Sequence, residues 1–147
     1  MGLIPLDNLV RIKQLKAEAG TQAEIDGLVR SGKSRLTDSQ NETLSLDSRF
    51  DLAYNAAHAL SLAALRWHGY RSEKRFTIFQ CLEHTLNTPP EQWRVLDQAH
   101  RKRNLAEYEG ELDVDRTLLE AVIRVTNDVA KGVAALGPLR AEDNSSK

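Results

Sequence analysis

The residues best suited to chemistry lie in the stretch Asp97–Gly110, whose composition favours a helix. It holds three consecutive basic residues, Arg101, Lys102 and Arg103, followed by Asn104. At 100° per residue, Arg103 falls in the middle of the apolar stripe of this helix. A guanidinium facing a core is costly unless it is paired or hydrogen-bonded. We therefore expect Arg103 either to solve a local structural problem or to face a shared interface where an anion binds.

The neighbours of Arg103 add further polar chemistry to the same helix. His100, Asn104 and Glu107 lie at one edge of the apolar stripe, and Tyr108 lies just beyond Asn104. Asn104 and Tyr108 are one helical turn apart, so their side chains are expected to stack beside Arg103.

A core-facing arginine needs a partner, and an earlier helix offers two. Asp51 and Asn55 lie near the start of a long apolar segment, and either side chain could pair with Arg103 and orient it. The alternative interpretation is that these residues cap their own helix, with Tyr54 at the edge of the core. Both interpretations stay open on the sequence alone.

Composition limits the classes of protein and of partner. The chain has 147 residues and a net charge of −1, so no global field recruits nucleic acid or an anionic membrane. Cys81 is the single cysteine, which rules out an intrachain disulfide and fits the reducing cytoplasm. The N-terminus lacks the pattern of a signal peptide, and no apolar run approaches the ~20 residues that span a bilayer. We expect a cytoplasmic protein without a membrane segment.

Hydrophobic periodicity predicts helices throughout and no strands. We expect an all-α antiparallel bundle of five to six helices, with the long third helix in its middle. The predicted domains are a helical arm (1–20), the bundle (21–137) and a disordered tail (138–147). The predicted helices cover about 6–18, 22–39, 48–68, 75–86 and 89–108, and a last one begins at Asp113 or Asp115 and ends before Gly137.

Two other patterns suggest sites that we do not expect to exist. Gly27–Ser34 matches the phosphate-loop pattern letter for letter, but the segment before it reads as helix and no strand precedes it. We interpret it as a helix with two tolerated glycines. The four histidines do not occur at the i,i+3 or i,i+4 spacing of a helical metal site, so we expect no metal and no cofactor.

Two segments together resemble a known family. Phe50-Asp-Leu-Ala-Tyr-Asn-Ala-Ala, followed by Arg101-Lys-Arg-Asn-Leu-Ala-Glu-Tyr-Glu, is similar to the HEPN domains of prokaryotes, in particular small stand-alone proteins with an "RN…EY" signature. The resemblance covers about residues 20–136. It implies a bundle of four to five helices that usually forms a homodimer. Many members are RNA-cleaving toxins paired with a nucleotidyltransferase-type antitoxin, or parts of defence systems.

The family signature is an Arg, a polar residue after it and a His a few positions later, and both protomers contribute to a cleft that binds RNA or a nucleotide. Carried over, Arg103 matches the Arg and would contact phosphate and stabilise developing charge. Asn104 matches the polar residue and would orient the scissile region. Tyr108 stands where the His is expected. With a pKa of about 10, a Tyr is a poor base, although it can hydrogen-bond or stack on a base.

This departure puts metal-independent RNA cleavage in doubt and leaves RNA or nucleotide binding as the expectation. His100, one turn before Asn104, is the reserve acid or base. Arg101 and Lys102 would add phosphate contacts, although runs of basic residues on a helix commonly form a solvated face. The expected function is a toxin-like or defence-related protein that binds RNA. The alternative is a non-catalytic interaction module in which Arg103, Asn104 and Tyr108 form a polar network that fixes the dimer.

Overall fold

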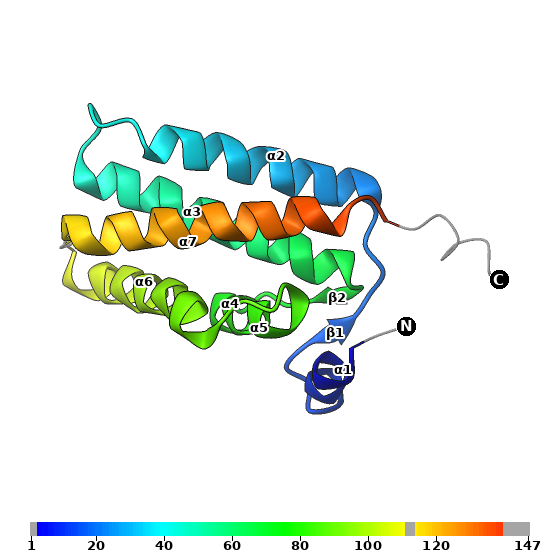
Figure 1. Cartoon of the computed structure of the whole chain (residues 1–147). Helices are drawn as coiled ribbons and strands as arrows, with labels where there is room; N and C mark the ends of the chain where they lie inside the picture. The colour runs from blue at the N-terminus through cyan, green and yellow to red at the C-terminus, as the bar shows by residue number, and fades with distance from the viewer. Residues whose placement is uncertain (1–2, 111–113, 140–147) are drawn as a thin grey trace.

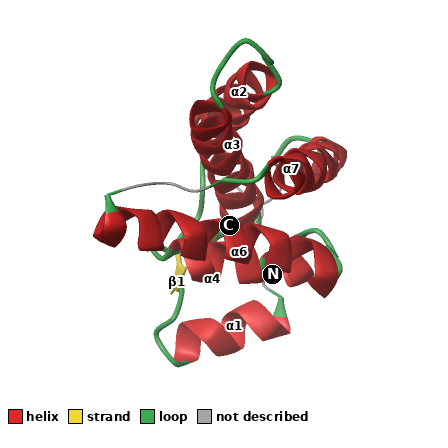
Figure 2. Cartoon of the chain, turned by 90° about the vertical axis from the view of Figure 1, so that its left-hand side faces the viewer, coloured by secondary structure: helices red, strands yellow, loops and turns green. Residues whose placement is uncertain are grey.

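Four long helices form the body of the molecule: α2 (Gln22–Ser39), α3 (Leu46–Trp67), α6 (Pro90–Glu109) and α7 (Arg116–Leu136). The computed structural model describes residues 3–110 and 114–139. Consecutive long helices run in opposite directions, as the colours of Figure 1 show. Figure 2 shows α2, α3 and α7 nearly end-on, with α6 lying across below them. The predicted all-α helical bundle is confirmed.

The long helix α3 lies at the centre of this bundle. Phe50, Ala53, Ala57 and Leu60 on α3 are fully buried, and α2 and α7 both pack against this helix. The alanines of α3 allow neighbouring helices to approach closely, and Gly32 on α2 does the same from the other side. A Cβ built on Gly32 would lie 2.7 Å from Leu60 Cγ. The small residues therefore set how closely α2 packs against α3.

Side-chain caps begin three of the long helices. Thr21 Oγ1 accepts from the amide of Glu24 at 3.1 Å, and Ser45 Oγ accepts from the third amide of α3 at 3.1 Å. Asp115 Oδ1 accepts from the amide of Leu118 at 2.7 Å. These bonds satisfy amides that have no partner within the helix. Gly110, with φ of 73°, ends α6 in the left-handed conformation that favours glycine.

The predicted fourth helix (75–86) is interrupted. The structure has α4 (Arg75–Gln80) and the single turn α5 (Leu82–Thr85), with Cys81 between them. The amide of Thr88 then bonds to the carbonyl of Leu82, so the chain turns away before the helix can continue.

The first predicted helix, 6–18, was too long, and its last residues form a short strand instead. Helix α1 (Ile4–Arg11) ends before Lys13, whose φ is +66°. The chain then forms β1 (Lys16–Ala17), which pairs antiparallel with β2 (Tyr70–Arg71). The prediction of no strands was therefore wrong. Strands of two residues are too short to show an alternating pattern. Their pairing is also between segments far apart in the chain, so the local sequence does not reveal it.

The N-terminal arm packs against the bundle through its own small core. This second core consists of buried apolar side chains from the arm, the end of α3 and the α4 region: Leu6, Leu15, Leu65, Tyr70, Ile78 and Cys81. Tyr70 Oη donates to Asp7 Oδ1 at 2.5 Å and accepts from the amide of Leu3 at 3.0 Å.

A buried arginine joins the arm to the bundle. Arg66, 3% exposed, pairs with Glu24 through Nε at 2.9 Å. Its other nitrogens donate to the carbonyls of Glu18 at 2.8 Å and Ala19 at 3.2 Å. A buried guanidinium is tolerated here because its donors meet carboxylate and carbonyl oxygens.

The C-terminal end of α7 is fixed by contacts with α2 and α3. Trp67 Nε1 donates to the carbonyl of Gly137 at 2.9 Å, and the amide of Leu139 donates to Gln22 Oε1 at 2.7 Å. Residues 138–139 of the predicted tail are thus placed, and 140–147 lie outside the described residues. Across 3–110 and 114–139, none of the helices is both long and apolar enough to cross a membrane.

Candidate functional site

Polar side chains from three helices meet beside the first half of α3. We call this group the polar cluster. Its members come from α3, from the first turn of α4 and from the second half of α6: Asp51, Tyr54, Asn55, Arg75, His100, Arg103 and Asn104. Most of the residues predicted for the site are therefore brought together, from segments about fifty positions apart in the chain.

Arg103 is held against α3 by Asp51. Its Nε lies 3.1 Å from Asp51 Oδ1, and the two side chains are 35% and 46% exposed. The expectation of an Arg in the middle of the core face was wrong. The guanidinium lies at the boundary of the core because α6 crosses α3 at an angle, which leaves this part of α6 at the edge of the interface. A half-exposed ion pair leaves part of the guanidinium open to a ligand.

A second arginine enters the cluster from α4. Arg75 donates through Nη1 to Asn55 Oδ1 at 3.1 Å, so Asn55 orients Arg75 rather than Arg103. The Arg75 Cζ atom lies 5.1 Å from the centre of the Tyr54 ring, and the Arg103 Cζ atom lies 6.0 Å from the same centre. Both distances are within the range of cation–π attraction. Tyr54 thus brings two positive groups close together.

His100 connects the cluster across α3 and α6. Its Nδ1 lies 2.9 Å from Tyr54 Oη, and its Nε2 lies 3.2 Å from Asn104 Nδ2. An amide nitrogen only donates, so Nε2 is the acceptor and Nδ1 carries the hydrogen of the neutral ring. Nδ1 then donates to Tyr54 Oη, and this bond lies inside the protein because Tyr54 is only 4% exposed. The fully buried Phe79 packs edge-on against both rings and forms the floor.

The protonation states follow from burial. Burial lowers the pKa of His100, with Asp97 opposing the shift and Arg75 adding to it. Burial raises the pKa of Tyr54, opposed mainly by Arg75. Near neutral pH, His100 is therefore a neutral imidazole and Tyr54 a neutral phenol. The cluster holds two arginines and one carboxylate, so its net charge is positive.

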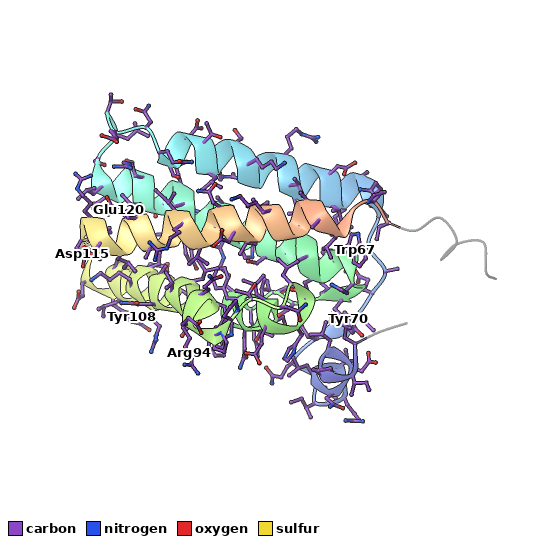
Figure 3. The ribbon with its side chains drawn as sticks, in the orientation of Figure 1. Trp67, Tyr70, Arg94, Tyr108, Asp115 and Glu120 are labelled. Carbon is purple, nitrogen blue, oxygen red and sulfur yellow. The ribbon has the colours of Figure 1, made fainter. Side chains whose placement is uncertain are left out.

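Three of the predicted residues are not part of the cluster. Tyr108 is 93% exposed and lies near the end of α6 (Figure 3). Five positions separate it from Arg103, which turns it roughly 140° away around the helix. Arg101 is exposed and pairs with Asp97 at 3.3 Å. Lys102 is partly buried, and the cluster contacts do not include it. His100, named as the reserve acid or base, lies in the cluster and bonds to Tyr54 and Asn104.

The sequence interpretation missed Tyr54 and Arg75 as members of the site. Tyr54 lies within the segment that carries the family resemblance, between Asp51 and Asn55. This position could have marked it as a member of the site. Arg75 was not among the residues predicted for the site. No local pattern identifies it, because its partner Asn55 is twenty positions away on another helix.

The structure also bears on the phosphate-loop pattern and on the possibility of a metal site. Gly27–Ser34 lies inside α2, so its amides bond within the helix and cannot cradle a phosphate. In the part of the chain that the structure describes, no group of three His, Cys, Asp or Glu side chains could hold a metal ion.

Compared with known protein families, curated proteins and solved structures, the chain matches none of them. The interpretation of the polar cluster therefore rests on its own chemistry and on the motif resemblance.

Proposed function

We propose that the polar cluster binds single-stranded RNA and that the protein is a HEPN-like, toxin-like or defence-related protein. The observation that carries the proposal is the placement of Arg75 and Arg103 around the Tyr54 ring with His100 bonded to it. Guanidinium groups bind phosphate oxygens in a bidentate manner. Aromatic rings and guanidinium planes also stack on unpaired bases. The cluster itself has two guanidinium groups and one carboxylate, Asp51, and the nearby Asp97 is paired with Arg101. Glu107 also acts on Tyr54, so the attraction for a phosphate would come from the two guanidinium groups themselves.

Cleavage of RNA is the further step that this geometry supports. When the ribose 2′-hydroxyl attacks the adjacent phosphorus, the bond from phosphorus to the 5′ oxygen breaks, one group accepts the hydroxyl proton, and a water molecule protonates the departing 5′ oxygen. A neutral imidazole is the group suited to accept a proton near neutrality. His100 Nε2 would take this role once the substrate displaces the Asn104 amide that is bonded to it. Arg103 would stabilise the charge that develops on the phosphate. Tyr108, exposed and remote, would contribute at most to stacking.

The resemblance extends the proposal to a cytoplasmic homodimer with a nucleotidyltransferase-type antitoxin as a partner. Leu105 and Tyr108 are 53% and 93% exposed and lie one turn apart near the C-terminal end of α6. Such an exposed apolar pair suits a symmetric contact between two copies of the chain. The molar mass in solution, measured by light scattering, tests the dimer.

A second function is favoured by a specific observation. The Arg103–Asp51 pair and the Tyr54–His100 bond both join α6 to α3 within one chain. In a non-catalytic interaction module, these contacts would hold the helices together. Tyr108, which the sequence placed in that network, is outside it.

The experiment that separates the two functions compares RNA binding and cleavage by wild type and variants, with EDTA present. Arg103→Ala and Arg103→Gln should keep the fold and weaken binding of a labelled single-stranded oligoribonucleotide by at least about tenfold, because a charge-assisted phosphate contact is lost. The matched control, Arg124→Ala, removes an exposed arginine of α7 outside the cluster and should bind normally.

Each outcome has one meaning. Cleavage by wild type that His100→Ala abolishes would establish a metal-independent ribonuclease at this cluster. Binding without cleavage would establish an RNA-binding module. Folded Arg103 variants that bind RNA like the wild type, or a wild type that binds no RNA, would refute the proposal. If neither wild type nor variants bind RNA and the Arg103 variants lose thermal stability, the structural role is supported.

A further inference from the structure

A cavity lies next to the polar cluster, on the side facing the short sheet. We call it the side cavity. Its volume is about 300 Å³, and its lining comes from Glu24 on α2, from His58, Leu62 and Arg66 on α3, and from Arg71, Ser72, Glu73 and Arg75, which lie from the end of β2 to the start of α4. This volume is at the lower end of the range for small-molecule sites.

The side cavity is continuous with the polar cluster. Arg75 lines the cavity and also faces Tyr54 and Asn55 in the cluster. On α3, His58 is one turn beyond Tyr54, and Leu62 is one turn beyond His58. Residues four apart share one face of a helix, about 6 Å from each other. Cluster and cavity therefore follow one another along the same face of α3, with Arg75 at the junction.

The charges of the cavity are arranged unevenly. Arg66 pairs with Glu24 at 2.9 Å and with Glu18 at 3.2 Å. Arg71 pairs with the same oxygen of Glu18 at 3.3 Å. Arg75 differs, because its described partners are the neutral side chains of Asn55 and Tyr54. Arg66 and Arg71 are thus balanced by Glu24 and Glu18, and Glu73 adds a negative charge to the lining. The positive charge that could meet a phosphate is therefore that of Arg75 at the junction.

The side chains in the cavity suit a flat, neutral, polar ring. Leu62 supplies an apolar wall, and Ser72 supplies a hydroxyl. Burial, aided by the charges of Arg75 and His100, lowers the pKa of His58 to about 4. The His58 ring is therefore neutral near pH 7, with one hydrogen-bond donor and one acceptor. A nucleobase edge offers the complementary pattern of donors and acceptors.

We propose that the side cavity is a second subsite of the RNA site. It takes the base of the nucleotide next to the one held at the polar cluster, and Arg75 binds the phosphate that joins the two nucleotides. The inference rests on the proposed RNA-binding function and deepens it. It gives the site a length of at least two nucleotides, and it assigns Arg75 a binding role at the junction.

Calorimetric titration of the full chain with a nucleoside monophosphate and with a 5′-phosphorylated dinucleotide tests the subsite. Wild type should bind the dinucleotide at least about tenfold more tightly than the mononucleotide. Leu62→Trp fills the cavity and should reduce this advantage below about twofold, with the mononucleotide affinity unchanged. Ser72→Trp, in the loop before α4, should give the same result without disturbing the packing of α3. The matched control is Leu44→Trp, in the loop between α2 and α3, which should keep the full advantage.

The results separate failure of the subsite from failure of the proposed function. Arg103→Ala should weaken binding of both nucleotides, because it acts at the polar cluster. Folded Leu62→Trp and Ser72→Trp proteins that keep the dinucleotide advantage would overturn the subsite while the RNA site stands. Equal affinity of wild type for both nucleotides would overturn it as well. A wild type that binds neither nucleotide nor RNA would overturn the subsite and the proposed function together.

Discussion

The arginines of this protein differ in burial, because Arg66 and Arg49 are 3% and 7% exposed whereas Arg75 and Arg103 are only partly buried. Arg66 donates hydrogen bonds to two carboxylates and to several carbonyls. The buried Arg49 donates to the carbonyl of Ser39 at 2.8 Å. In the described structure Arg103 pairs with Asp51, and Arg75 contacts Asn55 and Tyr54. A guanidinium carries five N–H donors. The arginines of the polar cluster therefore retain donors for an anion, whereas Arg66 and Arg49 hold the fold together.

At the residue scale, His58 predicts how stability depends on pH. Its folded-state pKa, about 4, lies below the ordinary value of 6.5. The unfolded chain therefore binds more protons in acid. The stabilisation is fully present above about pH 6.5 and is lost as the pH falls toward 4. When the pH is lowered from 7 to 5, the melting temperature of wild type should fall by about 3 °C more than that of His58→Gln.

Thermal denaturation followed by circular dichroism at both pH values measures this difference. His84→Gln, a substitution of another partly buried histidine outside the site, is the control and should follow the wild type. Parallel pH dependence of wild type and His58→Gln would show that His58 does not titrate on unfolding.

At the element scale, α2 shows why a sequence pattern needs its structural context. Gly27 and Gly32 fit a phosphate-loop pattern, yet both lie within one helix. Only one of them has a packing reason to be glycine. A Cβ on Gly32 would lie 2.7 Å from Leu60 Cγ, whereas the nearest atom to a Cβ on Gly27 is an Arg30 side-chain nitrogen at 3.9 Å.

These two glycines predict opposite effects of the same substitution. Gly32→Ala should lower the free energy of unfolding by about 1–3 kcal/mol, because it overpacks the contact of α2 with α3. Gly27→Ala should raise it by about 0.5–1 kcal/mol, because alanine is the better helix former. Urea denaturation measures both. Equal effects of the two substitutions would contradict the packing role assigned to Gly32.

At the scale of the whole molecule, the N-terminal arm is a packed part of the fold. Leu6 is fully buried in the second core, whereas Ile4 on the same helix is 75% exposed. Leu6→Ala should therefore lower the free energy of unfolding by about 2–4 kcal/mol, through lost burial and a remaining cavity. Ile4→Ala is the matched control, with an expected change within about 0.5 kcal/mol.

A single cooperative transition that shifts in Leu6→Ala, in a denaturant titration, would establish that arm and bundle unfold together. A Leu6→Ala protein as stable as the control would instead mark the arm as an independent appendage. The domain boundary predicted at residue 20 would then describe a separate unit.

The sequence by itself determined the helical class and the span of α2, because these depend on local periodicity. It also indicated the helix that carries Arg103, Asn104 and His100. Only the tertiary structure decided which side chains meet. The angle at which α6 crosses α3 placed Arg103 at the edge of the core and Tyr108 in solvent.

Tertiary structure also decided the contributions from distant segments. Arg75 reaches the cluster from α4, and β1 pairs with a strand more than fifty positions away. Contacts of this kind depend on how the helices pack in three dimensions, and packing leaves no repeat along the chain. The same holds for the side cavity, whose lining comes from α2, α3 and the segment before α4.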